Sequence, residues 1–288
     1  MKIVFFGSSE YSLLILKCLQ KIQGFDVSAV VTKPDKATGR DKQITPNPVS
    51  RFCADNHLPL LQPEAFDDQF SDTFRSLKPD LGLCVAYGPP YFSQELIDIP
   101  KYKIVNIHPS PLPKYRGATP GPWQIINNET KSAVTFFQID ILPDHGPVIT
   151  QIPFTISPDE TSSSFYQKAF NLAADSLETV LTSYIQNPQS LLPQDHSKKS
   201  YFPKLSKESA KIDWSWNINK IEHFIRALDP WPIAWTEVTN SKNQILKMKI
   251  FSSTFDFRLS TLRLGTVQIE GKKPIPWAEV KDYYRIIK

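Results

Sequence analysis

The sequence predicts an α/β protein with a largely parallel sheet, followed by a small β domain that forms a partial barrel. Through residue 186, short apolar segments alternate with amphipathic ones, as strands alternate with crossover helices. Residues 187–203 contain Pro and Ser and lack periodicity, which is typical of a linker. Segments of alternating polarity follow. We therefore expect domains at 1–186 and 204–288, joined by a linker at 187–203.

The predicted strands of the first domain are short and almost continuously apolar. Such strands are expected where helices cover both faces of a parallel sheet. They fall at residues 1–8, 25–32, 80–88, 103–110 and 133–140.

The predicted helices carry apolar residues at the spacing of one helical face. In the first domain they cover residues 10–22, 49–56, 67–77 and 161–186. Residues 33–48 are polar, basic and punctuated by Pro and Gly, which predicts a long exposed loop. For the second domain we expect a helix at 217–228 and strands at 235–238, 245–251 and 262–269.

Charge is distributed unevenly along the chain. Residues 204–288 hold 15 Lys and Arg against 9 Asp and Glu, whereas the rest of the chain is slightly acidic. A basic second domain predicts a polyanionic partner. A solvated basic surface would explain the same excess.

The three cysteines, Cys18, Cys53 and Cys84, have neither metal-ligand spacing nor the density of a disulfide framework. Their pattern predicts core residues in a reducing compartment, so we expect a cytoplasmic protein without a metal. We also expect a monomer. Glu10 and Tyr11 interrupt the apolar start, which favours a strand entering a helix over a signal peptide. No apolar run approaches the ~20 residues that span a bilayer, so we expect no membrane partner.

The chemistry is expected in residues 105–117, VNIHPSPLPKYRG. Asn106 and His108 are two apart at the end of a predicted strand, so they share one face at the carboxyl edge, where open α/β sheets bind ligands. Asp144 lies in a turn after the next predicted strand. Acyl transfer to an amine needs an amide to polarise the carbonyl, a group titrating near neutrality and a carboxylate. These three residues supply those groups.

Spacing alone leaves other interpretations open for the same residues. A histidine at a strand end is often structural, and an aspartate in a loop often forms a turn. Asn106 could cap a turn. Metal binding is a weaker interpretation, because Asn-x-His with one distant Asp lacks the clustered ligands of a zinc site.

The segments NIHPSPLPKYRG and FQIDILPDHG resemble the signature of the folate-dependent formyltransferases, Asn-x-His-x-Ser-Leu-Leu-Pro-x-x-Arg-Gly followed by Asp-x-x-x-Asp-x-Gly. The resemblance implies a Rossmann-like formyltransferase domain that uses 10-formyltetrahydrofolate, with catalytic roles for Asn106, His108 and Asp144. It also implies folate binding by Ser110, Pro111, Leu112, Pro113, Ala86, Tyr87, Gly88 and Asp140. In this chain Pro111 replaces the usual Leu, and His145 replaces a frequent Thr.

Among the acceptors used in this family, the resemblance favours initiator methionyl-tRNA. Residues 33–48 resemble the basic insertion loop of the tRNA-directed members, and residues 203–238 and 267–277 resemble the two ends of their OB-like C-terminal domain. The stretch between Thr254 and Leu264 is shorter than in the usual barrel, so we expect a shortened one. The resemblance implies tRNA contacts for Lys33, Lys36, Arg40, Lys42, Lys272 and Lys273.

Three alternative functions differ in what they require. An amino-sugar-nucleotide formyltransferase would share the donor and part of the tail, but would need a nucleotide pocket instead of a basic RNA surface. A folate or RNA carrier would not need Asn106, His108 and Asp144 together. A dehydrogenase is disfavoured because FFGSSEYS lacks the three-glycine phosphate turn.

Overall fold

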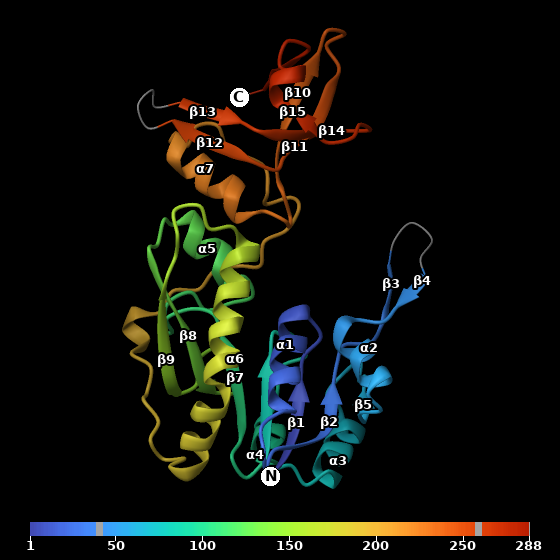
Figure 1. The fold of residues 1–288 in the computed structure, drawn as a ribbon, viewed down its shortest axis with the longest axis vertical. Coiled ribbons are helices and arrows are strands. Elements are labelled where there is room, and N and C mark those ends of the chain that lie inside the picture. The colour runs from blue at the N-terminus through green and yellow to red at the C-terminus, as the bar shows by residue number, and fades with distance from the viewer. Residues whose placement is uncertain (39–42, 257–260, 288) are drawn as a thin grey trace. The chain divides into compact units, whose positions relative to one another are not determined.

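The computed structural model describes residues 1–38, 43–256 and 261–287. The chain forms two compact units, each built from several stretches of sequence (Figure 1). The larger unit comprises residues 1–117, 133–154 and 167–201, and the smaller unit comprises 118–132, 155–166 and 202–288. Because the units interleave along the chain, the predicted division into consecutive domains stays a prediction.

A seven-stranded sheet in the order β5-β2-β1-β6-β7-β8-β9 forms the centre of the larger unit. Its strands are β1 (Lys2–Phe6), β2 (Asp26–Val31), β5 (Leu60–Leu61), β6 (Leu81–Val85), β7 (Ile104–His108), β8 (Lys131–Gln138) and β9 (Val148–Thr155). The strands from β5 to β7 are parallel, and β8 runs antiparallel to β7. The predicted, mainly parallel sheet is therefore confirmed.

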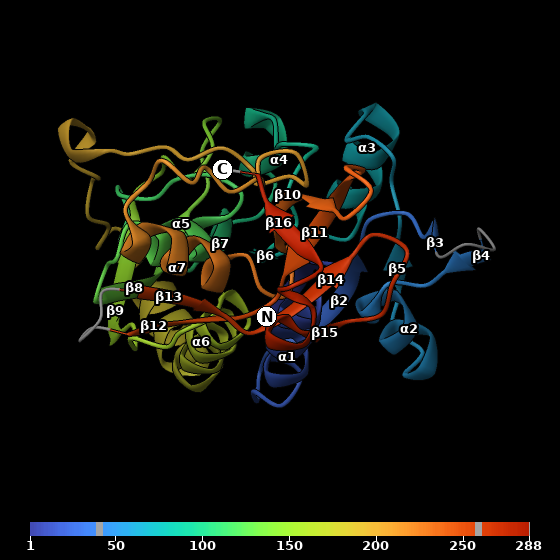
Figure 2. The same ribbon diagram turned by 90° about the horizontal axis from the view of Figure 1, so that it is seen from above.

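Helices cover both faces of this sheet (Figure 2). On one face lie α1 (Glu10–Leu19) and α6 (Ser162–Gln186), and Tyr11 stacks on Phe170 with ring centroids 5.0 Å apart. On the other face lie α3 (Asp68–Ser76) and α4 (Gln94–Asp98), while α2 (Pro48–Asp55) contacts α1. This two-sided cover explains why the strands are apolar along their whole length.

An aromatic cluster around Phe6 supports the carboxyl edge of the sheet. The ring of Phe6 is fully buried and makes edge contacts with four other rings at 5.0 to 6.2 Å. These rings are Phe66, Phe74, Tyr87 and Phe92. Because Phe6 ends β1 and Tyr87 follows β6, the cluster stabilises the base of the loops that leave this edge.

The smaller unit is an antiparallel β domain with two packed helices, α5 (Pro120–Ile126) and α7 (Ile218–Ala227). Its main sheet has the order β15-β14-β11-β10-β16, and β12 pairs with β13 in a separate hairpin. The strands are β10 (Ala234–Asn240), β11 (Ile245–Ile250), β12 (Ser253–Asp256), β13 (Thr261–Leu264), β14 (Thr266–Ile269), β15 (Ile275–Pro276) and β16 (Tyr284–Ile286). In the described part of the chain, β15 and β16 do not pair, so the expected small β domain is a half-barrel.

Two predicted segments have a different local structure. The described part of residues 33–48 is not only loop, because β3 (Lys36–Thr38) pairs antiparallel with β4 (Gln43–Thr45). The predicted strand at 262–269 divides at Gly265, whose N–H donates to the Ser252 carbonyl at 2.8 Å. The bond keeps the antiparallel register, because Gly265 lies opposite Ser252 just as Leu264 lies opposite Ser253 and Val267 lies opposite Ile250. The strand β9 and the short helices α4, α5 and α8 (Trp277–Val280) were not predicted.

Candidate active site

The candidate site lies where β6 and β7 end at the carboxyl edge of the larger unit's sheet. Their parallel register pairs Cys84 with Asn106, so both strands end at the same level. The chain leaves β6 through Ala86 and Gly88, which have φ angles of 48° and 70° and are both exposed. The backbone at this edge is therefore open to a ligand, as expected for a parallel α/β sheet.

Asn106 and His108 are two residues apart in β7, so their side chains leave the same face of the sheet. The side-chain oxygen of Asn106 is buried and has no hydrogen-bond partner in the residues that the structure describes. Oxygen and nitrogen of a terminal amide are assigned from their surroundings, so either end can face this position. A buried amide that lacks a partner within the protein fits a group that bonds to a substrate.

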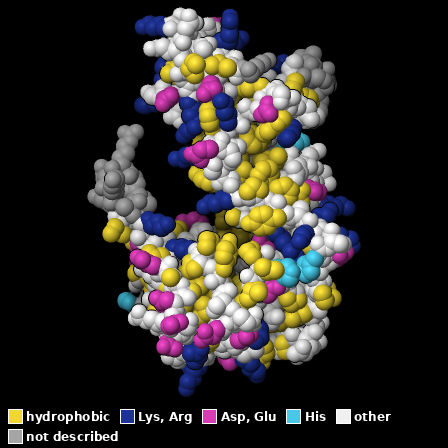
Figure 3. All heavy atoms as spheres, turned by 180° about the vertical axis from the view of Figure 1, so that it is seen from behind, with side chains coloured by type: hydrophobic (Ala, Val, Ile, Leu, Met, Phe, Trp, Pro, Cys, Tyr) yellow, Lys and Arg dark blue, Asp and Glu magenta, His cyan; other side chains and the backbone are white. Residues whose placement is uncertain are grey.

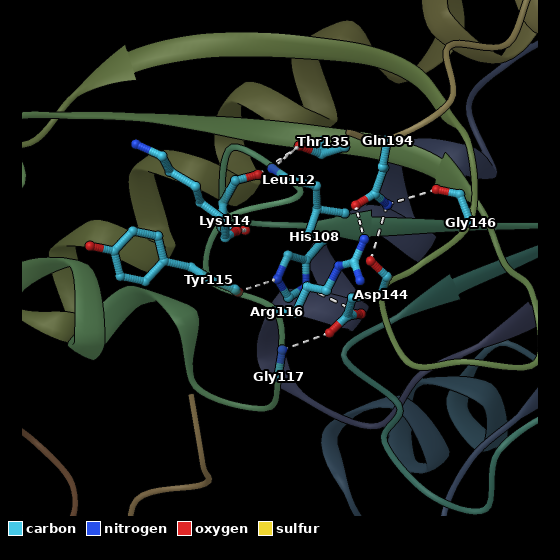
Figure 4. Close-up of polar contacts among 11 residues, drawn as sticks. His108, Leu112, Lys114, Tyr115, Arg116, Gly117, Thr135, Asp144, Gly146 and Gln194 are labelled. Atoms are coloured by element: carbon cyan, nitrogen blue, oxygen red, sulfur yellow. Dashed lines mark hydrogen bonds and ion pairs between the residues drawn. The ribbon is translucent and has the colours of Figure 1, made fainter. Parts of the chain in front are cut away.

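His108 is fixed in one orientation by a backbone carbonyl. Its side chain is almost fully buried, and Nε2 lies 3.0 Å from the carbonyl oxygen of Tyr115 (Figure 4). Because a carbonyl only accepts, Nε2 carries the hydrogen of this bond. The other ring nitrogen, Nδ1, faces Asp144 Oδ1 at 3.7 Å. The imidazole therefore presents Nδ1, and only Nδ1, to the carboxylate.

Asp144 reaches His108 from the loop between β8 and β9. It adopts φ 53°, a left-handed conformation that aspartate tolerates better than most residues. Its Oδ2 accepts the backbone N–H of Gly117 at 2.8 Å, which leaves Oδ1 for His108. The loop is tightly closed, because a Cβ at Gly146 would lie 1.9 Å from the Gln138 carbonyl oxygen. Two loops that are distant in sequence thus meet at one carboxylate.

A second layer of polar residues holds these loops, and no role for them follows from the sequence alone. Arg116 is buried, and its Nη2 donates to Gln194 Oε1 at 2.6 Å and contacts His196 Nδ1 at 2.8 Å. Burial lowers the pKa of Arg116, and the charges of Asp144 and Asp140 partly reverse that shift. Arg116 lies in the motif at 105–117, and this position is the sequence feature that could have identified it. Gln194 lies in the aperiodic stretch at 187–203, and no sequence feature there points to it.

The predicted folate loop is held by its own side chains. Ser110 is fully buried, and its hydroxyl donates to the Lys114 carbonyl at 2.8 Å. Leu112 is also buried, and its N–H donates to Thr135 Oγ1 at 3.4 Å. The remaining two members, Pro111 and Pro113, are half-buried. Ser110 and Leu112 therefore shape the loop, whereas the prolines keep surface that a ligand can contact.

The other predicted folate residues divide in the same way. The ring of Tyr87 belongs to the aromatic cluster, and Lys33 Nζ lies 4.1 Å above its centroid. Burial raises the pKa of Tyr87 and lowers that of Lys33. The carboxylate of Asp140 contacts His145 Nδ1 at 2.5 Å and accepts the Leu142 N–H at 2.9 Å. Asp140 and the ring of Tyr87 thus make contacts within the protein, whereas the buried Tyr87 hydroxyl has no hydrogen-bond partner among the described residues.

The three cysteines lie in the larger unit, and two of them are buried. Burial raises the pKa of Cys84 to about 12 and that of Cys53 to about 11, so both thiols stay protonated near neutrality. Cys18 is also a free thiol. Within residues 1–38, 43–256 and 261–287, no three His, Cys, Asp or Glu side chains are arranged to hold a metal ion.

The predicted RNA-contacting residues fall on two surfaces. Lys36, Lys272 and Lys273 are exposed, Lys33 is half-buried, and Arg40 and Lys42 lie outside the described residues. Lys and Arg side chains are visible on the face of the smaller unit shown in Figure 3.

A pocket of ≈ 460 Å³ in the smaller unit contains one of these lysines, Lys272. Among the residues that the structure describes, its lining has two lysines, two tyrosines and no carboxylate. The lining residues are Asn240, Ser241, Lys242, Gln244, Lys272, Val280, Tyr283 and Tyr284. Lys272 Nζ lies 5.4 Å from the ring centroid of Tyr284, and Tyr283 is 69% exposed.

Sequence comparisons agree with this arrangement. A family model described as "Formyl transferase" matches residues 1–181, and one described as "Formyl transferase, C-terminal domain" matches residues 204–258. The chain is 38% identical to a methionyl-tRNA formyltransferase of Chloroflexus aggregans over 82% of this chain and 76% of that protein. It is 35% identical to that of Acetivibrio thermocellus over 94% of this chain and 86% of the relative.

Solved structures share the fold at lower identity. The methionyl-tRNA formyltransferase from Clostridium thermocellum superposes with a TM-score of 0.61 at 14% identity, covering 93% of this chain and 98% of that one. The sugar 3N-formyl transferase WlaRD, solved in the presence of dTDP and 5-N-formyl-THF, gives 0.65 at 22% identity, covering 89% and 87%. The matching family model covers more than half of the chain and includes every predicted catalytic position, so the chain belongs to the formyl transferase family.

Proposed function

We propose that this chain transfers a formyl group from 10-formyltetrahydrofolate to the α-amino group of initiator methionyl-tRNA, giving N-formylmethionyl-tRNA. The observation that carries the proposal is the approach of His108 Nδ1 to Asp144 Oδ1, at 3.7 Å, in a formyl transferase. Similarity to methionyl-tRNA formyltransferases supports the choice of acceptor. The reduced folate present in a structure of the same fold supports the donor.

Asn106 would act on the formyl oxygen. As the α-amine nitrogen bonds to the formyl carbon, negative charge develops on that oxygen, and the Asn106 amide N–H donates to it. A neutral amide provides this stabilisation without adding a charge to the site. The Asn106 side-chain oxygen is buried without a hydrogen-bond partner among the described residues, so the protein does not fix which end of the amide faces a substrate.

His108 and Asp144 would hold and transfer the protons that move during the reaction. Nε2–H of His108 is committed to Tyr115, so Nδ1 is the ring atom that can hold a proton beside the developing oxyanion. Asp144 accepts the proton that the attacking amine loses, directly or through one water. The bond between the formyl carbon and N10 of the donor then breaks, and the proton passes to N10. One C–N bond forms and one breaks, so atoms and charge balance.

The acceptor RNA would be held by cations outside this site. We assign phosphate contacts to Lys36, Arg40 and Lys42 of the basic segment, with a smaller contribution from half-buried Lys33. In the smaller unit, Lys272 and Lys273 would contact phosphates. The pocket beside Lys272 suits an unstacked nucleotide, because its volume lies in the range of small-ligand sites and its tyrosines can stack on a base.

We place this reaction in the cytoplasm and propose a monomeric enzyme without a metal. Free thiols at Cys18, Cys53 and Cys84 fit a reducing compartment. Among the described residues, even the 25-residue helix α6 falls short of the apolar character needed to cross a membrane.

The test is formyl transfer by the purified chain, with labelled 10-formyltetrahydrofolate and three acceptors in parallel. These are initiator methionyl-tRNA, elongator methionyl-tRNA and an amino-sugar nucleotide. We expect label in initiator methionyl-tRNA at a kcat/KM at least tenfold above the other two. Label in the sugar nucleotide alone would assign the chain to the sugar branch of the family, and no transfer to any amine would remove the enzyme proposal.

A further inference from the structure

Residues 192–201 contact both loops of the candidate site, the loop that follows β7 and the loop between β8 and β9. Leu192 and Val148 exchange two backbone hydrogen bonds of 2.8 Å, which fix the start of this stretch to β9. Its end is fixed by Ser200, whose carbonyl accepts the Arg116 N–H at 2.9 Å and whose hydroxyl accepts the Tyr115 N–H at 2.9 Å. An aperiodic segment is therefore attached to the larger unit at both ends.

Between these attachments, Gln194 joins the two catalytic loops through one side-chain amide. Gln194 is 7% exposed, and its Nε2 donates to the carbonyls of Asp144 at 3.0 Å and Gly146 at 2.7 Å (Figure 4). Its Oε1 accepts Arg116 Nη2 at 2.6 Å. Carbonyls only accept and a guanidinium only donates, so the amide has one possible orientation. Each of its polar atoms thus has a partner.

Arg116 extends the same connection to His196. A guanidinium has no acceptor, so His196 Nδ1 must accept the Arg116 Nη2 hydrogen at 2.8 Å and is unprotonated there. His196 also stacks on His145 with centroids 4.0 Å apart, and His145 contacts Asp140. The loop at 139–147 is therefore held from two sides.

We propose that Gln194 is a positioning residue that sets the separation of Asp144 and His108. The inference rests on the proposed function and adds to it a residue outside the reacting groups. Gln194 fixes the Asp144 backbone directly, and through Arg116 it fixes the loop whose Gly117 N–H holds the Asp144 carboxylate. Removing the amide leaves two carbonyls and one guanidinium N–H without this partner in a buried place, so the two loops lose one of the connections that hold them together.

The test compares Gln194→Leu and Gln194→Glu with a matched control, Gln124→Leu. Gln124 is also fully buried, donates to the Pro120 carbonyl at 3.2 Å and accepts the Ser132 hydroxyl at 2.6 Å, but it lies in the smaller unit. The glutamate variant keeps the acceptor for Arg116 and loses both donors to the loop carbonyls. The three variants therefore separate loss of the loop contacts from loss of a buried amide in general.

We expect Gln194→Leu and Gln194→Glu each to lower kcat by about 10- to 100-fold, because a displacement near 1 Å at a reacting group costs about 10²-fold. KM values for the folate and for methionyl-tRNA should stay within about twofold, since neither substrate loses a contact. Gln124→Leu should lower the melting temperature and leave kcat per folded molecule unchanged. A kcat equal to wild type in folded Gln194→Leu, or an equal loss in Gln124→Leu, would overturn the positioning role.

A second measurement separates this inference from the proposed function. The ¹⁵N chemical shift of His108 Nδ1 reports its contact with Asp144 and needs no substrate. This chemical shift should change in Gln194→Leu and be unchanged in Gln124→Leu. An unmoved shift in both variants refutes the positioning role even where the wild type proves inactive toward methionyl-tRNA, whereas an inactive wild type with a moved shift refutes the proposed substrate alone.

Discussion

The edge of the larger unit's sheet that holds the candidate catalytic residues, here called the catalytic edge, and the lysine pocket of the smaller unit use polar residues in opposite ways. At the catalytic edge, His108, Arg116 and Gln194 are 5–7% exposed and have named partners at 2.6 to 3.0 Å. At the pocket, Lys242 and Lys272 are exposed and Tyr283 is 69% exposed. Chemistry at a carbonyl requires fixed atoms, whereas attraction to phosphate acts over the Debye length and tolerates mobile side chains. Single substitutions should therefore act strongly at the first region and weakly at the second.

The largest effect should come from Asp144→Asn. The amide keeps the shape and can still accept the Gly117 N–H, but it cannot take the amine proton. We expect kcat to fall by about 10³-fold with little change in tRNA affinity, as measured by single-turnover transfer and filter binding. Asp98→Asn is the control, because Asp98 is an exposed carboxylate that pairs with Gln94 and Lys103 at the surface. Turnover within threefold of wild type would exclude Asp144 from the proton transfer.

Asn106→Ala should have the second largest effect, because it should lower kcat without lowering stability. Loss of one donor to an oxyanion lowers kcat by about 10²-fold. The buried side-chain oxygen has no hydrogen-bond partner among the described residues, so its removal breaks no bond that stabilises the fold. We expect the free energy of unfolding to stay within about 1 kcal/mol of wild type or to increase. A clear loss of stability in urea unfolding would show that Asn106 is structural.

The double variant Lys242→Ala/Lys272→Ala should have a smaller effect, confined to RNA. Each lysine that neutralises a phosphate contributes about 0.7 to 0.9 to the slope of log K against log salt, so the slope should fall by about 1.5. We expect tRNA binding to weaken several-fold at low salt with unchanged kcat at saturating tRNA. Lys2→Ala/Lys21→Ala, a change at two exposed lysines of the larger unit, controls for the loss of two charges. An unchanged salt slope would remove the pocket from the RNA surface.

The two regions also differ in how much of them the sequence predicts. Asn106 and His108 could be placed together because strand periodicity puts residues two apart on one face, and register with β6 sets the level of that edge. The half-barrel could be predicted from the short stretch before Leu264, but the separation of β12 and β13 from the main sheet could not be predicted from local sequence.

Gln194 was not predictable, because its partners are 48 to 78 residues away in sequence. Its neighbours at 187–203 have the composition of a linker, and composition reports mean polarity without reporting which amide is buried. Local patterns and the family resemblance therefore predict the reacting groups, whereas the long-range contacts around them appear only in the three-dimensional structure.

The smallest effect should appear in thiol labelling, which reports whether the catalytic edge is a closed framework. Cys84 pairs in register with Asn106, and burial raises its pKa to about 12, so at pH 8 roughly one molecule in 10⁴ carries the reactive thiolate. Cys53, with a pKa raised to about 11, should also react slowly, whereas half-buried Cys18 should react first. We expect one fast thiol per chain with a disulfide reagent and all three after unfolding, with no loss of kcat on labelling Cys18. Fast labelling of Cys84 in the native protein would mean that the sheet opens beside Asn106, and the contrast between a fixed catalytic edge and a mobile RNA surface would then no longer hold.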